Sequence, residues 1–393
     1  MTMLRGWTTR YQALAVTLAA GMACGDDGSS AMETSAPTTT VTPGSESSPS
    51  DPTSSEMTTT PVTTGDDPTD GPPTTATDDS ADSGDSTGDE PEPTEVCPDP
   101  PFADSPLPSP MASASPIAGT SLGLYPGGLV EGPVWIDGAL YLSHFGPGPE
   151  PSASILRYTP GGALEEHIAG TGSNGLAVDA RGFIVATTHD DGGLSRFGLD
   201  GTRSAIVTEF EGNRFNSPND LTLRSDGTIY FTDPNWQATN PNPQPVHGIY
   251  RVSPDGTVSL EDGGQNLPNG ITLSPDESLI YVGTPGGVLR YEVGADGALV
   301  TPPTPFAPGL GLNSVDGMAL DCAGNLYVSL HSQGQVRVVA PDQSELGTIT
   351  IAPSVTNVAF GGPQRRTLYA TAGDPNNGDS VYSIELEIPG YPY

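Results

Sequence analysis

The sequence predicts an all-β fold, a six-bladed β-propeller, in the part of the chain that follows residue 128. Two observations lead to this prediction. A unit of strand, tight turn and returning strand recurs six times, at spacings between 41 and 50 residues, and no stretch shows the 3.6-residue periodicity of an amphipathic helix. A unit of about 45 residues that contains only strands and turns is the size of one four-stranded propeller blade.

The unit is clearest over residues 214–234. Asn219 opens its first strand, Asp226-Gly227 forms a tight turn, and Ile229–Phe231 returns as an apolar strand. The first polar residues of the six units are Glu131, Asn174, Asn219, Asn269, Asp316 and Asn357. Third strands are expected over residues 155–158, 194–197, 249–252, 288–291, 336–339 and 381–384.

The last unit ends after its third strand, near Glu387. A segment within residues 112–128 is therefore expected to add the missing outer strand, because closing the ring with both ends of the chain removes free strand edges. We expect residues 97–128 to form an N-terminal segment that closes the ring and residues 129–393 to form the propeller.

Residues 1–24 have the pattern of an export signal. Arg5 and Arg10 precede a short apolar run and then small residues before Cys24. The run is too short to span a bilayer, which takes about 20 residues. Cys24 and the residues around it resemble a bacterial lipoprotein processing site, although Gly21 stands where leucine is usual. We expect a lipid anchor at Cys24 facing the periplasm or cell surface; the alternative is a soluble secreted protein.

Residues 25–96 are rich in Thr, Ser and Pro and hold 17 acidic and no basic residues. Such a segment has little to bury and repels itself, so a disordered linker is expected. The remainder carries 31 acidic residues against 11 arginines, and the chain has no lysine. This charge disfavours nucleic acid as a partner, because phosphate contacts need clustered Lys or Arg.

Two further cysteines lie in the part expected to fold. Cys97 is at its start and Cys322 is deep within it. In an oxidising compartment such a pair is a plausible disulfide. The Cα separation that a disulfide requires does not follow from the sequence, so the pairing stays open.

The first polar residues of the six units indicate a metal site. The first strand of each propeller blade lines the central channel, so these six side chains should converge on one mouth of it. They offer only oxygen donors, with two carboxylates among them, which suits Ca²⁺ first and Mg²⁺ or Mn²⁺ as alternatives. Zn²⁺ is the least favoured alternative, because it prefers His and Cys. The competing interpretation is that the polar residues, and the Asn-Gly pairs above all, only form turns.

The second strands should return to the same mouth. The residues at their ends are His144, His189, Asp233, Thr284 and His331. Histidine suits acid–base catalysis near neutral pH. As candidates for that role His189 is favoured most and His144 least.

Several longer motifs occur together between residues 120 and 390. They are Glu131-Gly-Pro-Val-Trp135, Arg214-Phe-Asn-Ser-Pro-Asn-Asp220 with Tyr230-Phe-Thr-Asp-Pro234, Leu267-Pro-Asn-Gly270 with Ser274-Pro-Asp276, and Asp316-Gly-Met-Ala-Leu-Asp321. In combination they resemble the SMP-30/gluconolactonase/luciferin-regenerating-enzyme family of six-bladed propeller hydrolases. The resemblance implies divalent-metal ligands at Glu131, Asn219, Asn269 and Asp316.

The resemblance also implies substrate contacts at Arg214 and Asn216, to which we add His331 at the mouth. Asn174 and Asn357 are expected to hydrogen-bond the ligands or metal-bound water. Two stretches depart from the family pattern. Thr187-Thr188-His189 stands where bacterial gluconolactonases commonly have Cys-Glu-His, and Asn235-Trp236 replaces a usual aromatic. Both stretches touch the pocket rim, so they put the particular substrate in question.

The predicted function is metal-dependent lactone hydrolysis. The metal would polarise the carbonyl, His189 or Asp316 would activate water, Asp233 would support them, and Arg214 would orient the substrate. Asn216 and Asp220 are otherwise read mainly as loop and turn formers. One alternative is aryl-ester or phosphotriester hydrolysis on the same scaffold. Another is a surface-tethered binding propeller without catalysis, whose metal is only structural. The expected partner is a small lactone or ester, and the expected membrane contact is the lipid anchor alone.

Overall fold

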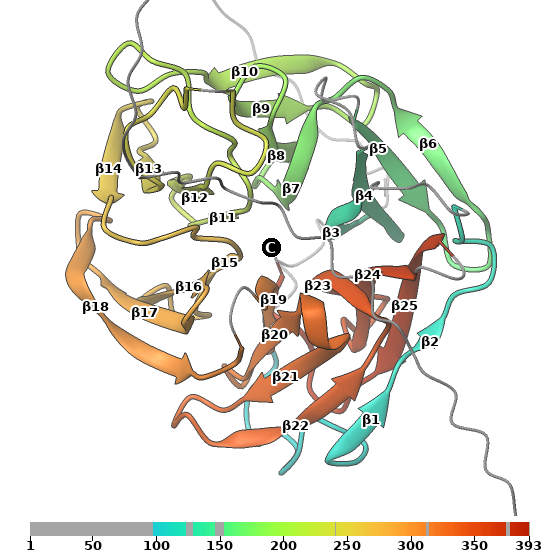
Figure 1. The fold of residues 1–393 in the computed structure, drawn as a ribbon. Helices are drawn as coiled ribbons and strands as arrows, with labels where there is room; N and C mark the ends of the chain where they lie inside the picture. The colour runs from blue at the N-terminus through green and yellow to red at the C-terminus, as the bar shows by residue number, and fades with distance from the viewer. Residues whose placement is uncertain are drawn as a thin grey trace, which may run out of the picture. The chain divides into compact units, whose positions relative to one another are not determined.

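Six β-sheets arranged around a central channel make up the fold (Figure 1). The computed structural model describes residues 97–122, 129–145, 153–239, 241–311, 314–374 and 378–392. These residues belong to the second of two compact units, residues 86–393. The export signal, Cys24 and the acidic linker, all predicted from the sequence, lie outside the described residues.

The six sheets follow one another in chain order, so the predicted six blades are confirmed. Blade 1 consists of β3 (Leu129–Ile136), β4 (Ala139–Phe145), β5 (Ala153–Tyr158) and β6 (Leu164–Ile168). Blade 2 consists of β7 (Ser173–Val178), β8 (Ile184–Thr188), β9 (Gly193–Phe197) and β10 (Arg203–Val207). Blade 3 consists of β11 (Leu221–Leu223), β12 (Ile229–Asp233), β13 (Gly248–Val252) and β14 (Val258–Asp262).

The other three blades repeat the pattern. Blade 4 consists of β15 (Ile271–Leu273), β16 (Leu279–Thr284), β17 (Gly287–Val293) and β18 (Leu299–Pro308). Blade 5 consists of β19 (Val315–Leu320), β20 (Leu326–Leu330), β21 (Gln335–Val339) and β22 (Glu345–Thr350), and its one helical turn is η1 (His331–Gln333). Blade 6 begins with β23 (Ser354–Gly361), β24 (Thr367–Asp374) and β25 (Gly378–Glu385).

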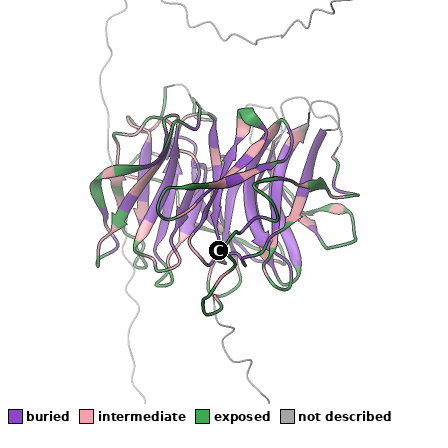
Figure 2. Cartoon of the chain, turned by 90° about the horizontal axis from the view of Figure 1, so that it is seen from below, coloured by how far each residue is buried: buried purple, intermediate pink, exposed green. Residues whose placement is uncertain are grey.

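Burial follows the position of a strand within its blade. The second strands β8, β12 and β20 are buried along their whole length, because both faces of an inner strand pack against neighbouring blades. The outer strands β10 and β14 have only exposed or half-buried residues. In Figure 2 the interior of the blades is mostly buried (purple), and the exposed residues (green) lie mainly on turns and outer segments. The core is therefore made by the contacts between blades.

The outer strand β18 illustrates the rule for edges. It contains Pro302, Pro303 and Pro305, which have no N–H to donate. Such residues are tolerated because β18 pairs only with β17 and has its other edge outside the sheet. Prolines on an exposed edge also discourage pairing with another chain.

The N-terminal segment closes the ring as predicted. β2 (Ser115–Pro116) pairs antiparallel with β25 and supplies the fourth strand of blade 6. The structure adds a contact that the repeat did not predict. β1 (Met111–Ser113) pairs in parallel with β22, so blade 5 has five strands. One short segment thus fastens two neighbouring blades.

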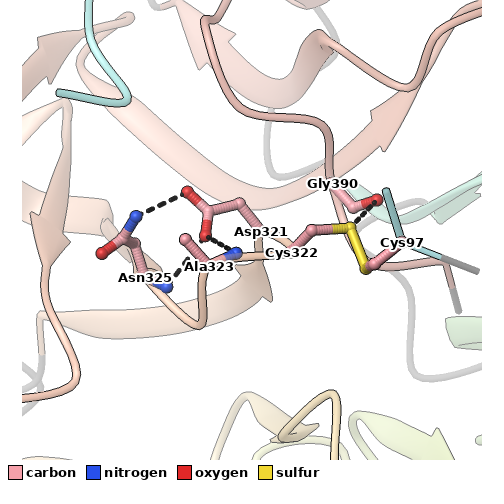
Figure 3. The surroundings of a disulfide bond; sticks show 6 residues. All are labelled: Cys97, Asp321, Cys322, Ala323, Asn325 and Gly390. Atoms are coloured by element: carbon pink, nitrogen blue, oxygen red, sulfur yellow. Dashed lines mark hydrogen bonds between the residues drawn. A yellow bond between two sulfur atoms is a disulfide. The ribbon is translucent and has the colours of Figure 1, made fainter. Parts of the chain in front are cut away.

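A disulfide reinforces this closure (Figure 3). Cys97 is bonded to Cys322, with a Cα–Cα distance of 5.6 Å. Cys322 follows β19, and the neighbouring Asp321 accepts hydrogen bonds from the backbone and side chain of Asn325. The pairing that the sequence left open is thus present in the structure. It joins the start of the described chain to the turn after the first strand of blade 5. In the described part of the chain, no helix is long and apolar enough to cross a membrane.

Candidate active site

A cavity of about 450 Å³ opens where the first strands of the blades begin. The polar residues that line it are Glu131, Asn174, Asn219, Gln237, Asn269, Asp316 and His331. Five of the six predicted first polar residues are in this set, and four of those five were the expected metal ligands. Asn357, the sixth, lines a much smaller space together with Gly132 and Asp220. The register argument thus correctly brings the four candidate ligands to one cavity.

The chain reaches the cavity through irregular strands. The pairing register of the first strand shifts in four blades, between Glu131 and Val134, Ser173 and Leu176, Val315 and Met318, and Val355 and Asn357. A β-bulge bends a strand and re-aims its side chains, and bulges are common next to functional sites. The regularity of the pleat is therefore interrupted where the polar side chains must turn toward the cavity.

The glycines that follow these polar residues allow the blades to approach one another. A Cβ atom on Gly175 would lie 2.7 Å from the Asn219 carbonyl oxygen, and one on Gly270 would lie 2.3 Å from the Asp316 carbonyl oxygen. No side chain fits at such distances. The Asn-Gly pairs are therefore not turn formers at these positions. They are places where neighbouring first strands touch around the channel.

Threonine hydroxyl groups in one blade donate hydrogen bonds to the backbone of the candidate ligand residue in the next blade. Thr187 in blade 2 donates to the Asn219 carbonyl oxygen at 2.7 Å, and Thr232 in blade 3 donates to the Asn269 carbonyl oxygen at 2.7 Å. The Asn269 side chain continues this direction, because its Nδ2 donates to the Val315 carbonyl oxygen at 3.2 Å. The ligand residues are thus fixed by contacts between blades as well as within them.

Three carboxylates lie close together in and below the cavity. Glu131 accepts hydrogen bonds from the Gly132 N–H at 3.0 Å and from Asn357 Nδ2 at 3.1 Å. Burial, and then repulsion from Asp316 and Asp220, raise the pKa of Glu131 well above its usual range. The group is arranged so that its negative charges repel one another.

Asp220 is a member of this group that the sequence interpretation missed. It was read mainly as a turn former, whereas the structure buries it beside Asn357, whose Nδ2 lies 3.5 Å from Asp220 Oδ2. Burial raises its pKa to about 7. The repeat contained the signal: the residue after the first polar position is glycine in four units and aspartate in the third. A charged residue in place of glycine was the exception that should have marked it.

His331 is the histidine that faces the cavity. Its Nδ1 lies 3.3 Å from Asp316 Oδ2. The hydrogen bond to Asp316 raises the pKa of His331, opposed by burial and assisted by the Val355 backbone. Predicted as a substrate contact, His331 is also the partner of a candidate ligand.

His189, the histidine favoured from the sequence, is in a different environment. Its side chain is buried, with Nε2 3.3 Å from Asn174 Nδ2 and with the ring edge-on to Phe145. Burial lowers its pKa to about 4. His189 does not line the cavity directly but packs behind Asn174. The structure therefore does not support a direct catalytic role for it.

Two other predicted residues, Asp233 and Asn216, serve the loop that carries Asn219. Asp233 is fully buried and accepts from the backbone N–H groups of Asn216 and Ser217 at 2.9 and 2.8 Å. The Asn216 side chain donates to the Val246 carbonyl oxygen and accepts from the Gln244 N–H, both at 2.9 Å. Neither residue lines the cavity. In this structure Asp233 and Asn216 position the loop, and their catalytic and substrate roles stay predictions.

Arg214, predicted as a substrate contact, is held against blade 2 in this structure. Its guanidinium donates to the His189 carbonyl oxygen at 2.9 Å and packs against Gly192, where a Cβ would lie 2.4 Å from Nε. It is outside the cavity lining. In this arrangement Arg214 joins the turn between β8 and β9 of blade 2 to the loop before β11.

A family model described as the SMP-30/Gluconolactonase/LRE-like region matches residues 129–374, the span of the described blades from β3 to β24. The chain belongs to this family. The match covers every candidate ligand and both histidines discussed above, and it confirms the resemblance that the motifs indicated.

Relatives named as lactonases are similar to this chain over most of the propeller. A gluconolactonase from Zymomonas mobilis is 34% identical over 279 residues, which are 62% of this chain and 75% of the relative. Pentonolactonase XacC from Haloferax volcanii is 26% identical over 294 residues, which are 67% of this chain and 93% of the relative. The structure of a gluconolactonase from Xanthomonas campestris has 27% identity and a TM-score of 0.57, and the match covers 74% of this chain and 99% of that one.

Among the described residues of this family member, no group of three or more His, Cys, Asp or Glu side chains is arranged to hold a metal. The candidate set has a different composition, two carboxylates and two amides. Such oxygen-only sets are typical of Ca²⁺ and related hard cations. Glu131, Asn219, Asn269 and Asp316 are therefore the residues that could hold a cation in this cavity.

Proposed function

We propose that this protein hydrolyses lactones with a divalent cation held by Glu131, Asn219, Asn269 and Asp316, Ca²⁺ first and Mg²⁺ or Mn²⁺ as alternatives. The observation that carries the proposal is that these four oxygen donors line one cavity at the channel mouth. The gluconolactonase and pentonolactonase among the relatives support the reaction class.

The electrostatics of the cavity support a bound cation. Burial is the largest cause of the raised pKa of Glu131, and the nearby carboxylates of Asp316 and Asp220 raise this pKa further. A dication beside these groups would offset their mutual repulsion and favour the ionised forms. Among the described residues, no arginine lines the cavity to do so instead.

The orientation of the amides supports the same conclusion. Asn269 uses its Nδ2 to donate to the Val315 carbonyl oxygen at 3.2 Å. Its Oδ1 is therefore the amide atom that remains for a cation. In Asn357 the corresponding atoms have other partners, since Oδ1 accepts from the Val358 N–H and Nδ2 donates to Glu131. This supports the predicted supporting role of Asn357.

In the reaction, water adds to the lactone carbonyl carbon, the ring C–O bond breaks, and the leaving alkoxide takes up a proton to give a hydroxy acid. A bound dication supplies Lewis-acid polarisation of the carbonyl oxygen. Asp316 accepts the proton of the attacking water. His331 lies 3.3 Å from Asp316 Oδ2 and holds that carboxylate in position. We assign the proton-accepting role to Asp316 because His189 lies behind Asn174 and has its pKa lowered to about 4.

A lactone panel assayed with EDTA and metal add-back tests the proposal. We expect hydrolysis that chelation abolishes and a divalent cation restores. Glu131→Gln should lower kcat/KM by about 10³-fold, the scale of losing a main electrostatic contact to the transition state. Glu165→Gln on the exposed strand β6 is the matched control and should be unchanged. Full turnover after complete chelation would sink the proposal, and cation-dependent stabilisation without turnover would favour a binding propeller.

We also propose that the protein acts outside the cytoplasm and is attached by a lipid at Cys24. The N-terminal sequence supports this, as does the Cys97–Cys322 disulfide, because disulfides persist in oxidising compartments. In cells that express the full chain, Cys24→Ser should move the protein from the membrane fraction to the soluble fraction. Unchanged membrane association would contradict the anchor.

A further inference from the structure

The lining of the cavity changes character from its base to its rim. Along β3, Leu129 and Glu131 both line the cavity, whereas Gly132 lines the deeper space with Asp220. The polar ligands thus lie toward the channel, and apolar residues surround them on strand ends and loops. The apolar residues of the lining are Leu129, Phe145, Trp236, Leu267, Pro285 and Val315.

Trp236 is the most conspicuous of these residues. It lies three positions beyond the end of β12, and 43% of its surface is exposed. Within the described residues it is the one large, exposed apolar side chain that lines the cavity; the others are Met111, Leu260 and Val300. Exposed apolar surface beside a cavity is typical of a place that a ligand covers.

Leu267 adds an independent observation. Its φ is +47°, in the left-handed region that a leucine rarely adopts. Asparagine and glycine occupy this region at lower cost. A bulky apolar side chain held in an unfavourable backbone conformation against a cavity points to a requirement of that cavity. The requirement here is apolar surface two residues before the candidate ligand Asn269.

The two polar side chains predicted as substrate contacts, Arg214 and Asn216, lie outside the cavity lining. Arg214 donates to the His189 carbonyl oxygen, and the two ends of the Asn216 amide bind Val246 and Gln244. Among the described residues of the wall, Gln237 and His331 are the polar ones outside the first-strand set, and His331 faces Asp316. Ring hydroxyls placed against the remaining wall would lose hydrogen bonds to water without replacing them.

We infer that the substrate is a lactone whose ring carries an apolar substituent, an alkyl chain, packed between Trp236 and Leu267, rather than a polyhydroxylated sugar lactone. The inference rests on the proposed function and narrows its substrate class. The carbonyl lies at the polar base of the cavity and the substituent lies against the apolar wall. Binding of the substituent contributes through burial of each methylene group.

A matched series of δ-lactones tests this with the full chain and its activating cation. The series is δ-valerolactone, its 5-methyl, 5-propyl and 5-pentyl derivatives, and glucono-δ-lactone. We expect kcat/KM to rise about 4-fold per added methylene until the wall is covered, with glucono-δ-lactone the poorest. If glucono-δ-lactone is preferred over all alkyl lactones, the inference is overturned and lactone hydrolysis stands. If no lactone is hydrolysed with any cation, both the proposed function and this inference are overturned.

Two variants locate the preference on the wall. Leu267→Asn suits the backbone conformation and replaces the apolar surface, and Trp236→Ala removes the rim ring. Each should lower the ratio of kcat/KM for the 5-pentyl lactone to that for δ-valerolactone by about 10-fold. Leu260→Asn makes the same exchange at an exposed leucine on β14 and should leave the ratio unchanged. An unaltered ratio in both wall variants would overturn the inference.

Discussion

His189 and His331 end the second strands of blades 2 and 5, yet they have opposite environments. Each follows the last residue of its strand, Thr188 in β8 and Leu330 in β20. In blade 2 the partner on the first strand is Asn174, and burial lowers the pKa of His189 to about 4. In blade 5 the partner is Asp316, which raises the pKa of His331.

The comparison teaches that the repeat sets the position of each histidine along its blade, whereas burial and the first-strand partner set its protonation. The two histidines differ in burial, which is the main cause for His189, and in the exchange of one amide partner for one carboxylate. An amide gives a buried imidazole no charge to balance its protonation, whereas a carboxylate does. Changing the partner should therefore convert one environment toward the other.

Asp316→Asn is expected to have the largest effect. It gives blade 5 the partner found in blade 2 and removes a candidate cation ligand, so kcat/KM should fall by about 10³-fold or more. The pKa of His331 should fall as well, followed by NMR of its ring protons. Retained activity together with an unshifted His331 would break the comparison.

His331→Gln should have the next largest effect. The variant keeps Asp316 and removes the group that positions it, so kcat should fall by 10- to 100-fold, the range typical of partners of metal ligands. KM and the thermal midpoint should change little, which separates positioning from folding. The pH–rate profile should shift in the variant, and an unchanged profile with a lowered midpoint would indicate a purely structural role.

His189→Gln should act on stability. The buried ring is packed against Phe145 and faces Asn174, so its loss should cost about 2 kcal/mol of unfolding free energy. The kcat/KM of the folded variant should stay within about 3-fold of the parent, unlike that of His331→Gln. Urea denaturation and steady-state kinetics on the same samples measure both, and the reverse pattern would exchange the roles of the two histidines.

The pH dependence of that stability difference is the smallest effect. The folded pKa of His189 is lowered to about 4 from 6.5, so the unfolded chain binds more protons between these values and stability falls on acidification. From pH 7 to pH 5.5 the parent should lose about 1 kcal/mol more than His189→Gln. Asp233, with a pKa raised to about 7, contributes with the opposite sign but is present in both proteins. A constant difference across this range would mean that His189 is protonated in the folded protein.

The sequence predicted the fold well because blade repeats leave a periodic record. The period gave six blades, the missing outer strand and the register that brings Glu131, Asn219 and Asp316 to one cavity. The parallel pairing of β1 with β22 in blade 5 was not predicted, because β1 lies outside the repeated units.

The details of the site were harder to predict because they depend on side-chain direction. Arg214 and Asn216 belong to a family motif, yet Arg214 donates to the His189 carbonyl oxygen and Asn216 to the Val246 carbonyl oxygen. His189 and His331 share a register position, and the burial that separates them comes from neighbours distant in sequence. In the sequence, Asp220 differs only by standing where four of the six units have glycine. In the structure it lines a small space together with Gly132 and Asn357.

The hydroxyl groups of Thr187 and Thr232 have a consequence for the ring as a whole. Each binds the backbone of a candidate ligand in the following blade, so the spacing of the ligands is set by the circumference of the ring. A molecule or ion that contacts all four candidate ligand residues binds only the closed ring. By mass action, such binding raises the free energy needed to separate any two neighbouring blades. Binding in this one cavity therefore also stabilises the contacts between blades that the bound molecule does not touch.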